Sequence, residues 1–187
     1  MRDLLRRVRR TPERLLHPLR RRKLLEALST RAPPTTVLVV CHGNICRSPF
    51  AAALLARELA TDGVTVESRG FIGFNRPAPP DAVAAAARYG LNLADHRSRL
   101  LTADVVRAAD LIVVMDAGQQ RLICERFGRR PADVLILGDL DPAAVETRTI
   151  HDPVNDGREV FDWVYDRIAR CVQGLAITLS SPGVTPS

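Results

Sequence analysis

The chain has 187 residues, 46% of them hydrophobic and 26% charged, which is typical of one soluble globular domain. Its apolar runs, such as residues 111–115, are far shorter than the ~20 residues of a membrane-spanning helix, and the charged N-terminus argues against a secretory signal. The net charge of +6 is divided unevenly, because residues 1–34 hold 11 Lys or Arg against 3 acids whereas the remainder holds 16 against 18, which argues against a nucleic-acid-binding domain.

The basic N-terminal segment, residues 1–34, mixes arginine clusters with leucines at helical spacing. Thr11-Pro12 resembles a helix start, whereas Pro18 is expected to break any helix that begins there. We therefore predict two or three short, basic, amphipathic helices. Such a segment could lie on an anionic membrane surface, dock on a partner, or form a loosely ordered extension.

Short apolar segments alternate with helical patterns from Thr36 onward. The predicted strands are 37–40, 64–67, 111–115 and 134–137. The predicted helices are 49–60, 81–89, 102–109, 117–127 and 157–179, joined by long loops at 69–80 and 139–156. Thr102 and Asp116 are placed to cap two of the helices.

This alternation predicts an α/β fold, a doubly wound four-stranded parallel sheet with helices on both faces, preceded by the basic helical extension. The folded domain is expected to span residues 35–180, with a flexible tail at 181–187. In such a sheet the ligand crevice lies at the carboxyl ends of the strands, where the strand order reverses.

The first predicted strand runs directly into residues 41–49, Cys-His-Gly-Asn-Ile-Cys-Arg-Ser-Pro, at the start of a helix. Free amides and the dipole at a helix N-terminus attract anions, and Gly43 and Asn44 suit left-handed positions that turn further amides inward. The planar guanidinium of Arg47 can grip two oxygens of a tetrahedral dianion. The same positive field favours a thiolate at Cys41. The loop therefore predicts a phosphate-binding turn with a sulfur nucleophile at its centre.

A thiolate that attacks phosphorus needs an acid to protonate the departing oxygen. The late loop offers two Asp-Pro pairs, Asp152-Pro153 and Asp141-Pro142. Asp152 is favoured because it lies just before the last helix, whereas Asp141 lies close to the end of the fourth strand. Either pair could also be a simple turn.

At these residues the sequence resembles the low-molecular-weight protein tyrosine phosphatases, from about Thr36 to Leu179. The resemblance rests on the loop at 41–49, on Asp152-Pro153, and on LADHRSRLLTADVVRAADLIVVMD and FDWVYDRIARCV. It implies hydrolysis of phosphotyrosine on proteins, that is, of aryl phosphate monoesters, through a phosphocysteine intermediate. A bacterial tyrosine kinase is a possible protein substrate.

The resemblance also implies a role for each matching residue. Cys41 would be the nucleophile, Arg47 would bind phosphate and stabilise the transition state, and Asp152 would protonate the leaving group and then activate water. The substrate-binding loop would comprise His42, Gly43, Asn44, Ile45, Cys46 and Ser48. Ser68 and His96 would brace it by hydrogen bonds, and Cys46 could form a reversible disulfide with Cys41.

Two features leave the substrate open. Val154 and Asn155 stand where family members that act on phosphotyrosine often carry aromatic residues, and Phe71 or Phe74 could line the mouth instead. His42 replaces a more usual aliphatic residue.

Three alternatives are open. A protein arginine phosphatase resembles this loop with Thr at the position of Ile45. A thiol-dependent arsenate reductase needs two further cysteines near the third strand, where only Cys124 occurs. A phosphate-binding module would not turn over its ligand. Four cysteines at irregular spacing and without a CxxC pair, Cys41, Cys46, Cys124 and Cys171, indicate a reducing, cytoplasmic protein without a metal or other cofactor.

Overall fold

The computed structural model describes residues 2–180, with side chains from residue 13 onward, so the predicted tail at 181–187 lies outside the described residues. The strands are β1 (Thr36–Cys41), β2 (Thr65–Gly70), β3 (Leu111–Val114) and β4 (Val134–Ile136). The helices are α1 (Arg2–Ser29), α2 (Arg47–Glu58), α3 (Pro80–Ala87), α4 (Ala103–Ala108), α5 (Ala117–Phe127) and α6 (Arg158–Ser180), and two short 3-10 turns are η1 (Pro131–Asp133) and η2 (Leu137–Leu140).

The four strands form one parallel sheet in the order β2-β1-β3-β4, as the alternation predicted. In the register, Val39 lies between Ser68 of β2 and Val113 of β3. The strand order reverses between β1 and β3, so the loop that follows β1 opens at the switch point of the sheet.

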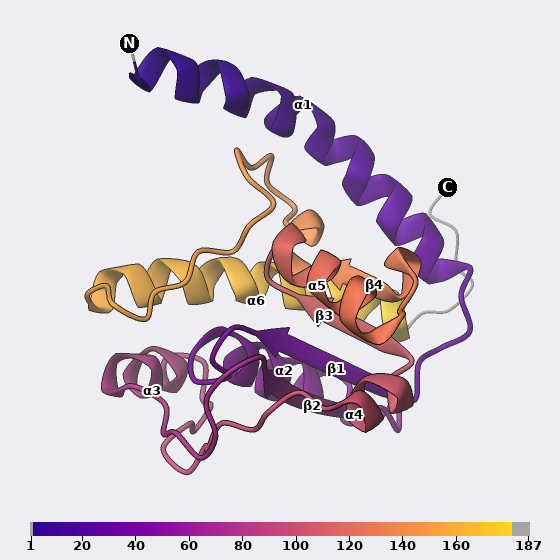
Figure 1. Ribbon diagram of the computed structural model, residues 1–187, viewed down its shortest axis with the longest axis vertical. Coiled ribbons are helices and arrows are strands. Elements are labelled where there is room, and N and C mark those ends of the chain that lie inside the picture. The colour runs from indigo at the N-terminus through magenta and orange to yellow at the C-terminus, as the bar shows by residue number, and fades with distance from the viewer. Residues whose placement is uncertain (1, 181–187) are drawn as a thin grey trace.

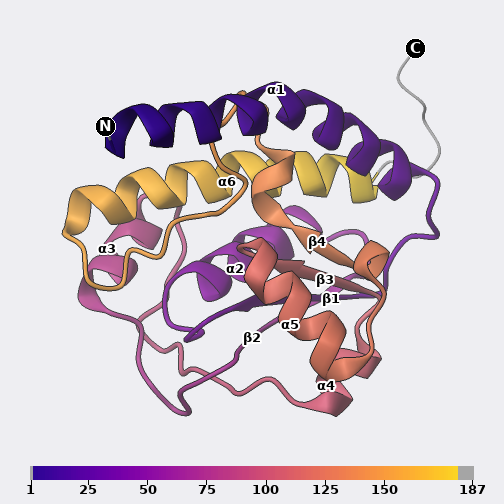
Figure 2. The ribbon, with the colours of Figure 1, turned by 45° about the horizontal axis from the view of Figure 1, so that its top comes forward.

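Helices cover both faces of the sheet (Figures 1 and 2). Val37 and Val39 of β1 belong to a core that includes α2 and α6, whereas Leu38 and Val40 belong to a second core with α4 and α5. Successive residues of a strand point to opposite faces, which explains why one continuous apolar run supplies both cores. The two faces fix β1, and therefore its C-terminal loop, from both sides.

The N-terminal segment is one helix, α1, and not the two or three short helices that Pro18 suggested. His17 is buried and its Nε2–H donates to the Asp141 carbonyl at 2.8 Å, while Arg21 Nε donates to the Leu140 carbonyl at 3.3 Å. These contacts lie on either side of Pro18, and the helix curves across the body instead of ending there (Figure 2). Tertiary contacts therefore outweigh the local cost of the proline.

The helix caps follow the sequence closely. The Thr102 side chain accepts a hydrogen bond from the Val105 amide, and Asp116 accepts one from the Gln119 amide. Gly128 ends α5 in the left-handed conformation, with φ of 67°. Within the described part of the chain, no helix is both long and apolar enough to cross a membrane.

Packing of α6 against the sheet is expected to dominate the stability of the fold. Leu175 is 0% exposed, whereas Ile177 on the same helix is 62% exposed. We predict that Leu175→Ala lowers the free energy of unfolding by ~2–5 kcal/mol, because it leaves a cavity in the core. Ile177→Ala is the matched control and should change the free energy of unfolding by about 0.5 kcal/mol or less. Urea denaturation measures both, and equal losses would contradict the assignment of the buried face.

Candidate active site

The loop between β1 and α2 folds around the sulfur of Cys41, which is only 2% exposed. The Asn44 amide donates to Cys41 Sγ at 3.3 Å, and Ser48 Oγ lies 3.0 Å from the same sulfur. Asn44 has a φ of 51° and therefore adopts the left-handed conformation that its residue type suggested. Gly43 has no positive φ, so the left-handed conformation expected there is wrong. The inward amides thus depend on Asn44 and on the helix start.

Helix α2 begins immediately beside this sulfur. Its first residue is Arg47, and the preceding Cys46 provides no side-chain cap. The first-turn amides and the positive end of the helix dipole are therefore available to an anion. The Cys46 carbonyl accepts a hydrogen bond from the Tyr165 hydroxyl at 3.0 Å. Burial raises the pKa of the Cys46 thiol to about 12, which keeps that thiol protonated at neutral pH.

Asn44 joins the loop to its surroundings through both ends of its side chain. Its Nδ2 donates to Ser48 Oγ and to Ser68 Oγ, each at 2.9 Å, and its Oδ1 accepts from the Arg99 amide at 2.8 Å. His96 Nε2–H donates to the Asn44 carbonyl at 2.7 Å. Ser68 and His96 thus contact, through Asn44, the loop that the resemblance implied they brace, whereas the Arg99 amide had no sequence signal.

Gly70, at the end of β2, is a second feature that sequence reasoning missed. A Cβ at this position would lie 2.8 Å from the Asn44 amide nitrogen. Since real Cβ atoms essentially never approach backbone so closely, only glycine lets the loop rest against β2. The packing of the loop is therefore set by a residue 26 positions further along the chain than Asn44.

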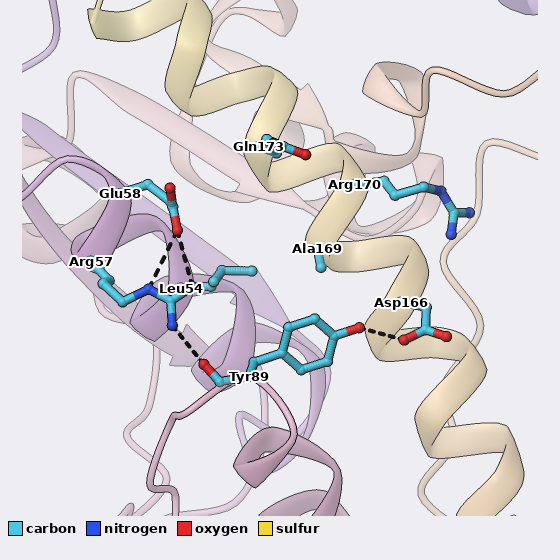
Figure 3. Close-up of a pocket in the computed structure, with 8 residues that line it drawn as sticks. All are labelled: Leu54, Arg57, Glu58, Tyr89, Asp166, Ala169, Arg170 and Gln173. Atoms are coloured by element: carbon cyan, nitrogen blue, oxygen red, sulfur yellow. Dashed lines mark hydrogen bonds and ion pairs between the residues drawn. The ribbon is translucent and has the colours of Figure 1, made fainter.

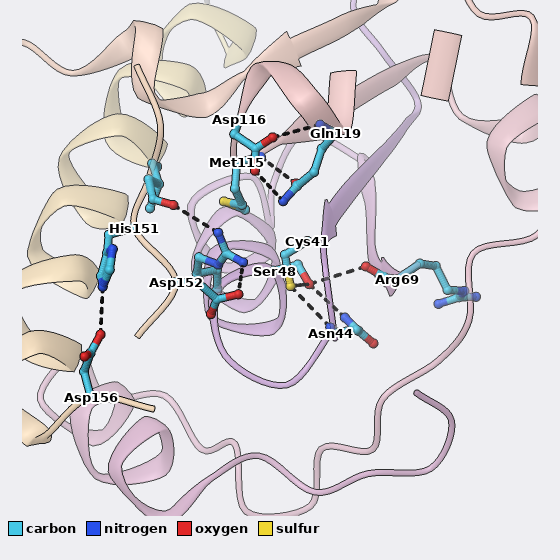
Figure 4. A network of polar contacts seen from close by, with 12 residues as sticks. Cys41, Asn44, Ser48, Arg69, Met115, Asp116, Gln119, His151, Asp152 and Asp156 are labelled. Carbon is cyan, nitrogen blue, oxygen red and sulfur yellow. Dashed lines mark hydrogen bonds and ion pairs between the residues drawn. The ribbon is translucent and has the colours of Figure 1, made fainter. Parts of the chain in front are cut away.

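The structure brings Arg47 and Asp152 together, although they come from opposite ends of the domain. The Arg47 side chain is 4% exposed, and its NH1 donates to the Ile150 carbonyl at 3.0 Å while NH2 pairs with the Asp152 carboxylate. Among the described residues, the buried Arg47 Nε has no hydrogen-bond partner. Figure 4 shows Asp152 on one side of Cys41. The guanidinium is thus fixed between the sulfur loop and a carboxylate.

A cavity of about 450 Å³ opens over this pair. Its lining includes His42, Phe71, Leu122, His151 and Asp152, together with Arg47, Asp116, Gly118, Gln119, Thr149 and Ile150. Phe71 therefore contributes to the mouth, as one interpretation of the sequence suggested. Leu122 was not foreseen, because it lies on an exposed turn of a helix distant in sequence.

Other residues considered for the mouth lie elsewhere. Phe74 is 73% exposed and does not line the cavity, and neither Val154 nor Asn155 lines it. His151 takes part instead, and its Nε2 contacts Asp156 at 2.7 Å (Figure 4). The lining here is supplied by His151, and not by the aromatic residues that family members acting on phosphotyrosine often carry after the Asp-Pro pair.

Asp141, the alternative acid, is wrong for that role. Its carboxylate is completely buried and pairs with Arg167 at 3.1 Å and with Arg170 at 3.4 Å. Arg167 also donates to the carbonyls of Thr147 and Thr149, which hold the loop that carries Asp152. Asp141 is therefore a structural residue, because a buried carboxylate in this network cannot reach a substrate.

A second pocket, of about 470 Å³, lies between α2 and α6 away from the sulfur loop (Figure 3). Some of its polar groups pair with one another, since the Tyr89 hydroxyl donates to Asp166 and Arg57 donates to the Tyr89 carbonyl at 2.6 Å. Burial and the Asp166 carboxylate raise the pKa of Tyr89 to about 12, so its phenol stays protonated. This pocket holds no nucleophile.

The described residues contain no group of three or more His, Cys, Asp or Glu side chains that could hold a metal ion. Cys41, Cys46, Cys124 and Cys171 are all free thiols in this structure. The polar groups around Cys41 suit an anion: they are amides, a hydroxyl and a guanidinium.

Comparison with known proteins places this geometry in a family. The family model described as low molecular weight phosphotyrosine protein phosphatase matches residues 36–183. The EpsP protein of Ralstonia nicotianae, named a probable low molecular weight protein-tyrosine-phosphatase, is 40% identical over 138 residues, which are 73% of this chain and 90% of that protein.

Solved structures show the same fold. The crystal structure of the Erwinia amylovora tyrosine phosphatase amsI has a TM-score of 0.68 and 31% identity, covering 76% of this chain and 91% of that chain. The YwlE arginine phosphatase from Geobacillus stearothermophilus has a TM-score of 0.71 and 30% identity, covering 79% of this chain and 94% of the other. The family model begins at residue 36 and therefore leaves α1 outside the region that it matches.

The burial of His96 makes the stability of the protein sensitive to pH. Burial is the main cause that lowers the pKa of His96 below its usual 6.5. His96 therefore takes up a proton at a higher pH in the unfolded chain than in the folded one. The contribution of neutral His96 to the free energy of unfolding is full above pH 6.5 and declines as the pH falls. We predict that the free energy of unfolding falls between pH 7.5 and 5.5, and that His96→Gln reduces this fall. Denaturation at several pH values tests it, and identical pH profiles would contradict it.

Proposed function

The chain belongs to the low molecular weight protein-tyrosine-phosphatase family, and we propose that it hydrolyses phosphotyrosine on proteins with Cys41 as the nucleophile. One observation carries the proposal. Cys41 Sγ accepts a hydrogen bond from the Asn44 amide and lies beside the start of α2, where Arg47 is paired with Asp152. Nucleophile, anion-binding guanidinium and candidate acid thus converge on one cavity.

In the proposed first step, the phosphate oxygens occupy the loop amides and the guanidinium of Arg47. The Cys41 thiolate attacks phosphorus, so an S–P bond forms while the bond between phosphorus and the tyrosine oxygen breaks. Asp152, in its protonated form, donates its proton to that oxygen. The hydroxyl of Ser48, 3.0 Å from the sulfur, stabilises the thiolate as the nucleophile and later as the leaving group.

In the second step, the Asp152 carboxylate takes a proton from water, which attacks the phosphocysteine and releases inorganic phosphate and the thiolate. The present pairing of Asp152 with Arg47 supports this assignment, because the carboxylate occupies a position from which an incoming phosphate would displace it. Displacement would free the carboxylate to take up a proton and face the leaving group.

The cavity supports an aromatic substrate. Phe71 and the exposed Leu122 flank it and can pack against the two sides of a phenyl ring. The proposed substrate is a phosphotyrosine-containing protein, for which a bacterial tyrosine kinase is one candidate. We place the activity in the cytoplasm, which the four free thiols support.

Phosphoarginine on proteins is a second candidate substrate, because the YwlE arginine phosphatase has a TM-score of 0.71 against this fold. The branched apolar side chain of Ile45 favours an aryl phosphate instead. The arsenate-reductase alternative has weaker support, since Cys124 packs against the α4–α5 core, away from the sulfur loop.

Two variants test the mechanism. Cys41→Ser should abolish release of phosphate from p-nitrophenyl phosphate and from a phosphotyrosyl peptide while it still binds inorganic phosphate or vanadate. Asp152→Ala should lower kcat by ~10²–10⁴-fold on the peptide, whose leaving group needs a proton, and less on p-nitrophenyl phosphate. Steady-state kinetics measure both.

Several outcomes would contradict parts of the mechanism. Equal losses on the two substrates would remove Asp152 from the acid role. Wild-type protein that binds phosphate without turnover would indicate a binding module. Release of phosphate from phosphoarginine but not from phosphotyrosyl peptides would favour the second candidate.

We also propose that residues 1–34 form a membrane-binding extension to the catalytic domain at 35–180. The inner side of α1 is held by His17 and Leu28, whereas Leu15 and Leu19 on its other side are at least half exposed. These leucines are accompanied by exposed Arg14, Arg22 and Lys23. An apolar stripe with flanking cations suits an anionic lipid surface.

Vesicle sedimentation tests this surface. The full chain should bind vesicles that contain anionic phosphatidylglycerol at least ~10-fold more strongly than neutral phosphatidylcholine vesicles, since each cation near the surface contributes to attraction. Leu15→Ser/Leu19→Ser should lower this binding, and Ile177→Ser, which changes an exposed residue of α6, should not. Equal binding by the wild-type protein and both variants, or equal binding to both vesicle types, would contradict the proposed membrane-binding surface.

A further inference from the structure

Two segments that are separate in the sequence form one rigid wall beside the sulfur loop. Residues 70–77 begin at the last residue of β2, and residues 96–101 precede α4. Their backbones are joined by hydrogen bonds of 2.8–2.9 Å, which run from Gly70 to Arg99, from Leu101 to Gly70, from Asn75 to Ser98 and from Ser98 to Arg76. The wall is therefore a built surface and not a loose loop.

The wall is continuous with the candidate active site. The Ile72 amide donates to the His42 carbonyl at 3.1 Å, the Arg99 amide donates to Asn44, and Phe71 lines the cavity. A substrate protein whose phosphotyrosine enters this cavity can therefore lay neighbouring residues along these segments, because Phe71 of the first segment lines the cavity.

The exposed side of the wall carries three arginines and no acid. These residues, Arg76, Arg97 and Arg99, are exposed, and we call them the arginine rim. Within the described residues, none of the three is ion-paired with a carboxylate. Arg97 donates to the carbonyls of Ala94 and His96, and these contacts hold its side chain close to the segment.

The neighbouring Arg69 differs, because Glu67 lies 2.6 Å from it and neutralises it. Figure 4 shows Arg69 on the other side of Cys41 from Asp152.

Backbone conformation places one of these arginines directly beside the sulfur loop. Gly73 has a φ of +77°, and a Cβ there would lie 2.8 Å from Arg76 Cδ. The same guanidinium lies 3.7 Å from where a Cβ on Gly43 would stand. Gly73 thus leaves room for the Arg76 side chain to lie across the wall toward the loop.

An apolar side chain accompanies the charges. Phe74, at the tip of the wall, is 73% exposed, and Ile72 beside it is exposed as well. An aromatic residue among arginines can pack against the aliphatic parts of a bound peptide while the guanidinium groups pair with its carboxylates.

We propose that the arginine rim binds acidic residues that flank the phosphotyrosine, so that acidic phosphotyrosyl segments are the preferred substrates. This inference rests on the proposed function and adds a substrate class to it. The carboxylates would lie over Arg76 and Arg97, and an apolar neighbour would pack on Phe74.

The test compares two phosphotyrosyl peptides of equal length, one with Glu and one with Gln on both sides of the phosphotyrosine. Wild-type protein should show a kcat/KM at least ~5-fold higher for the Glu peptide at low salt, and the ratio should fall as the salt concentration rises. Arg76→Gln/Arg97→Gln should bring the ratio close to one. It should leave kcat/KM for p-nitrophenyl phosphate, which has no flanking residues, within about twofold of wild type.

The matched control is Arg107→Gln/Arg130→Gln, which removes the same charge from two exposed arginines on α4 and after α5. It should retain the wild-type preference, which separates a local rim from the overall charge of the protein. A ratio of kcat/KM for the Glu peptide to that for the Gln peptide near one in wild-type protein, or an unchanged ratio in the rim variant, would overturn the inference. Turnover of both peptides would still support the proposed function in that case. Absence of turnover on any phosphotyrosyl substrate would overturn both.

Discussion

The hydrogen bonds of Asn44 hold the candidate active site together. This buried residue donates to Cys41 Sγ through its backbone amide and to Ser48 and Ser68 through its side chain, and it accepts hydrogen bonds from His96 and Arg99. Because all its polar groups are paired inside the protein, the loop is pre-organised before any anion binds. The direction of the amides, the place of the sulfur and the contact with the arginine rim all follow from this arrangement.

The other half of the site depends on the late loop. Asp152 pairs with Arg47 from a loop that is fastened by the buried ion pair between Asp141 and Arg167 and by hydrogen bonds from Arg167 to nearby carbonyls. Helix α1 contacts the start of the same loop through His17. The proposed acid is therefore supported by elements at both ends of the chain, one of which lies outside the region shared with the family.

Much of the fold could be predicted from local pattern. Apolar runs and helix caps at Thr102 and Asp116 gave elements that agree with the structure within three residues. The errors arose where a local rule met a tertiary contact. Pro18 should have broken the first helix, but contacts by the residues around it maintain the helix. Gly43 suggested a left-handed turn, yet the loop needs that conformation only at Asn44.

The sequence by itself determined the parallel sheet, the anion loop at the end of β1 and the candidates Cys41, Arg47 and Asp152, because each depends on periodicity or on residues adjacent in the chain. Only the tertiary structure decided that Asp141 is a buried ion-pair partner, that Leu122 lines the cavity and that Phe74 faces solvent. It also decided that three arginines from two segments form one rim. Such contacts depend on which segments, distant in the sequence, meet in the folded protein, and the spacing of residues along the chain does not determine this.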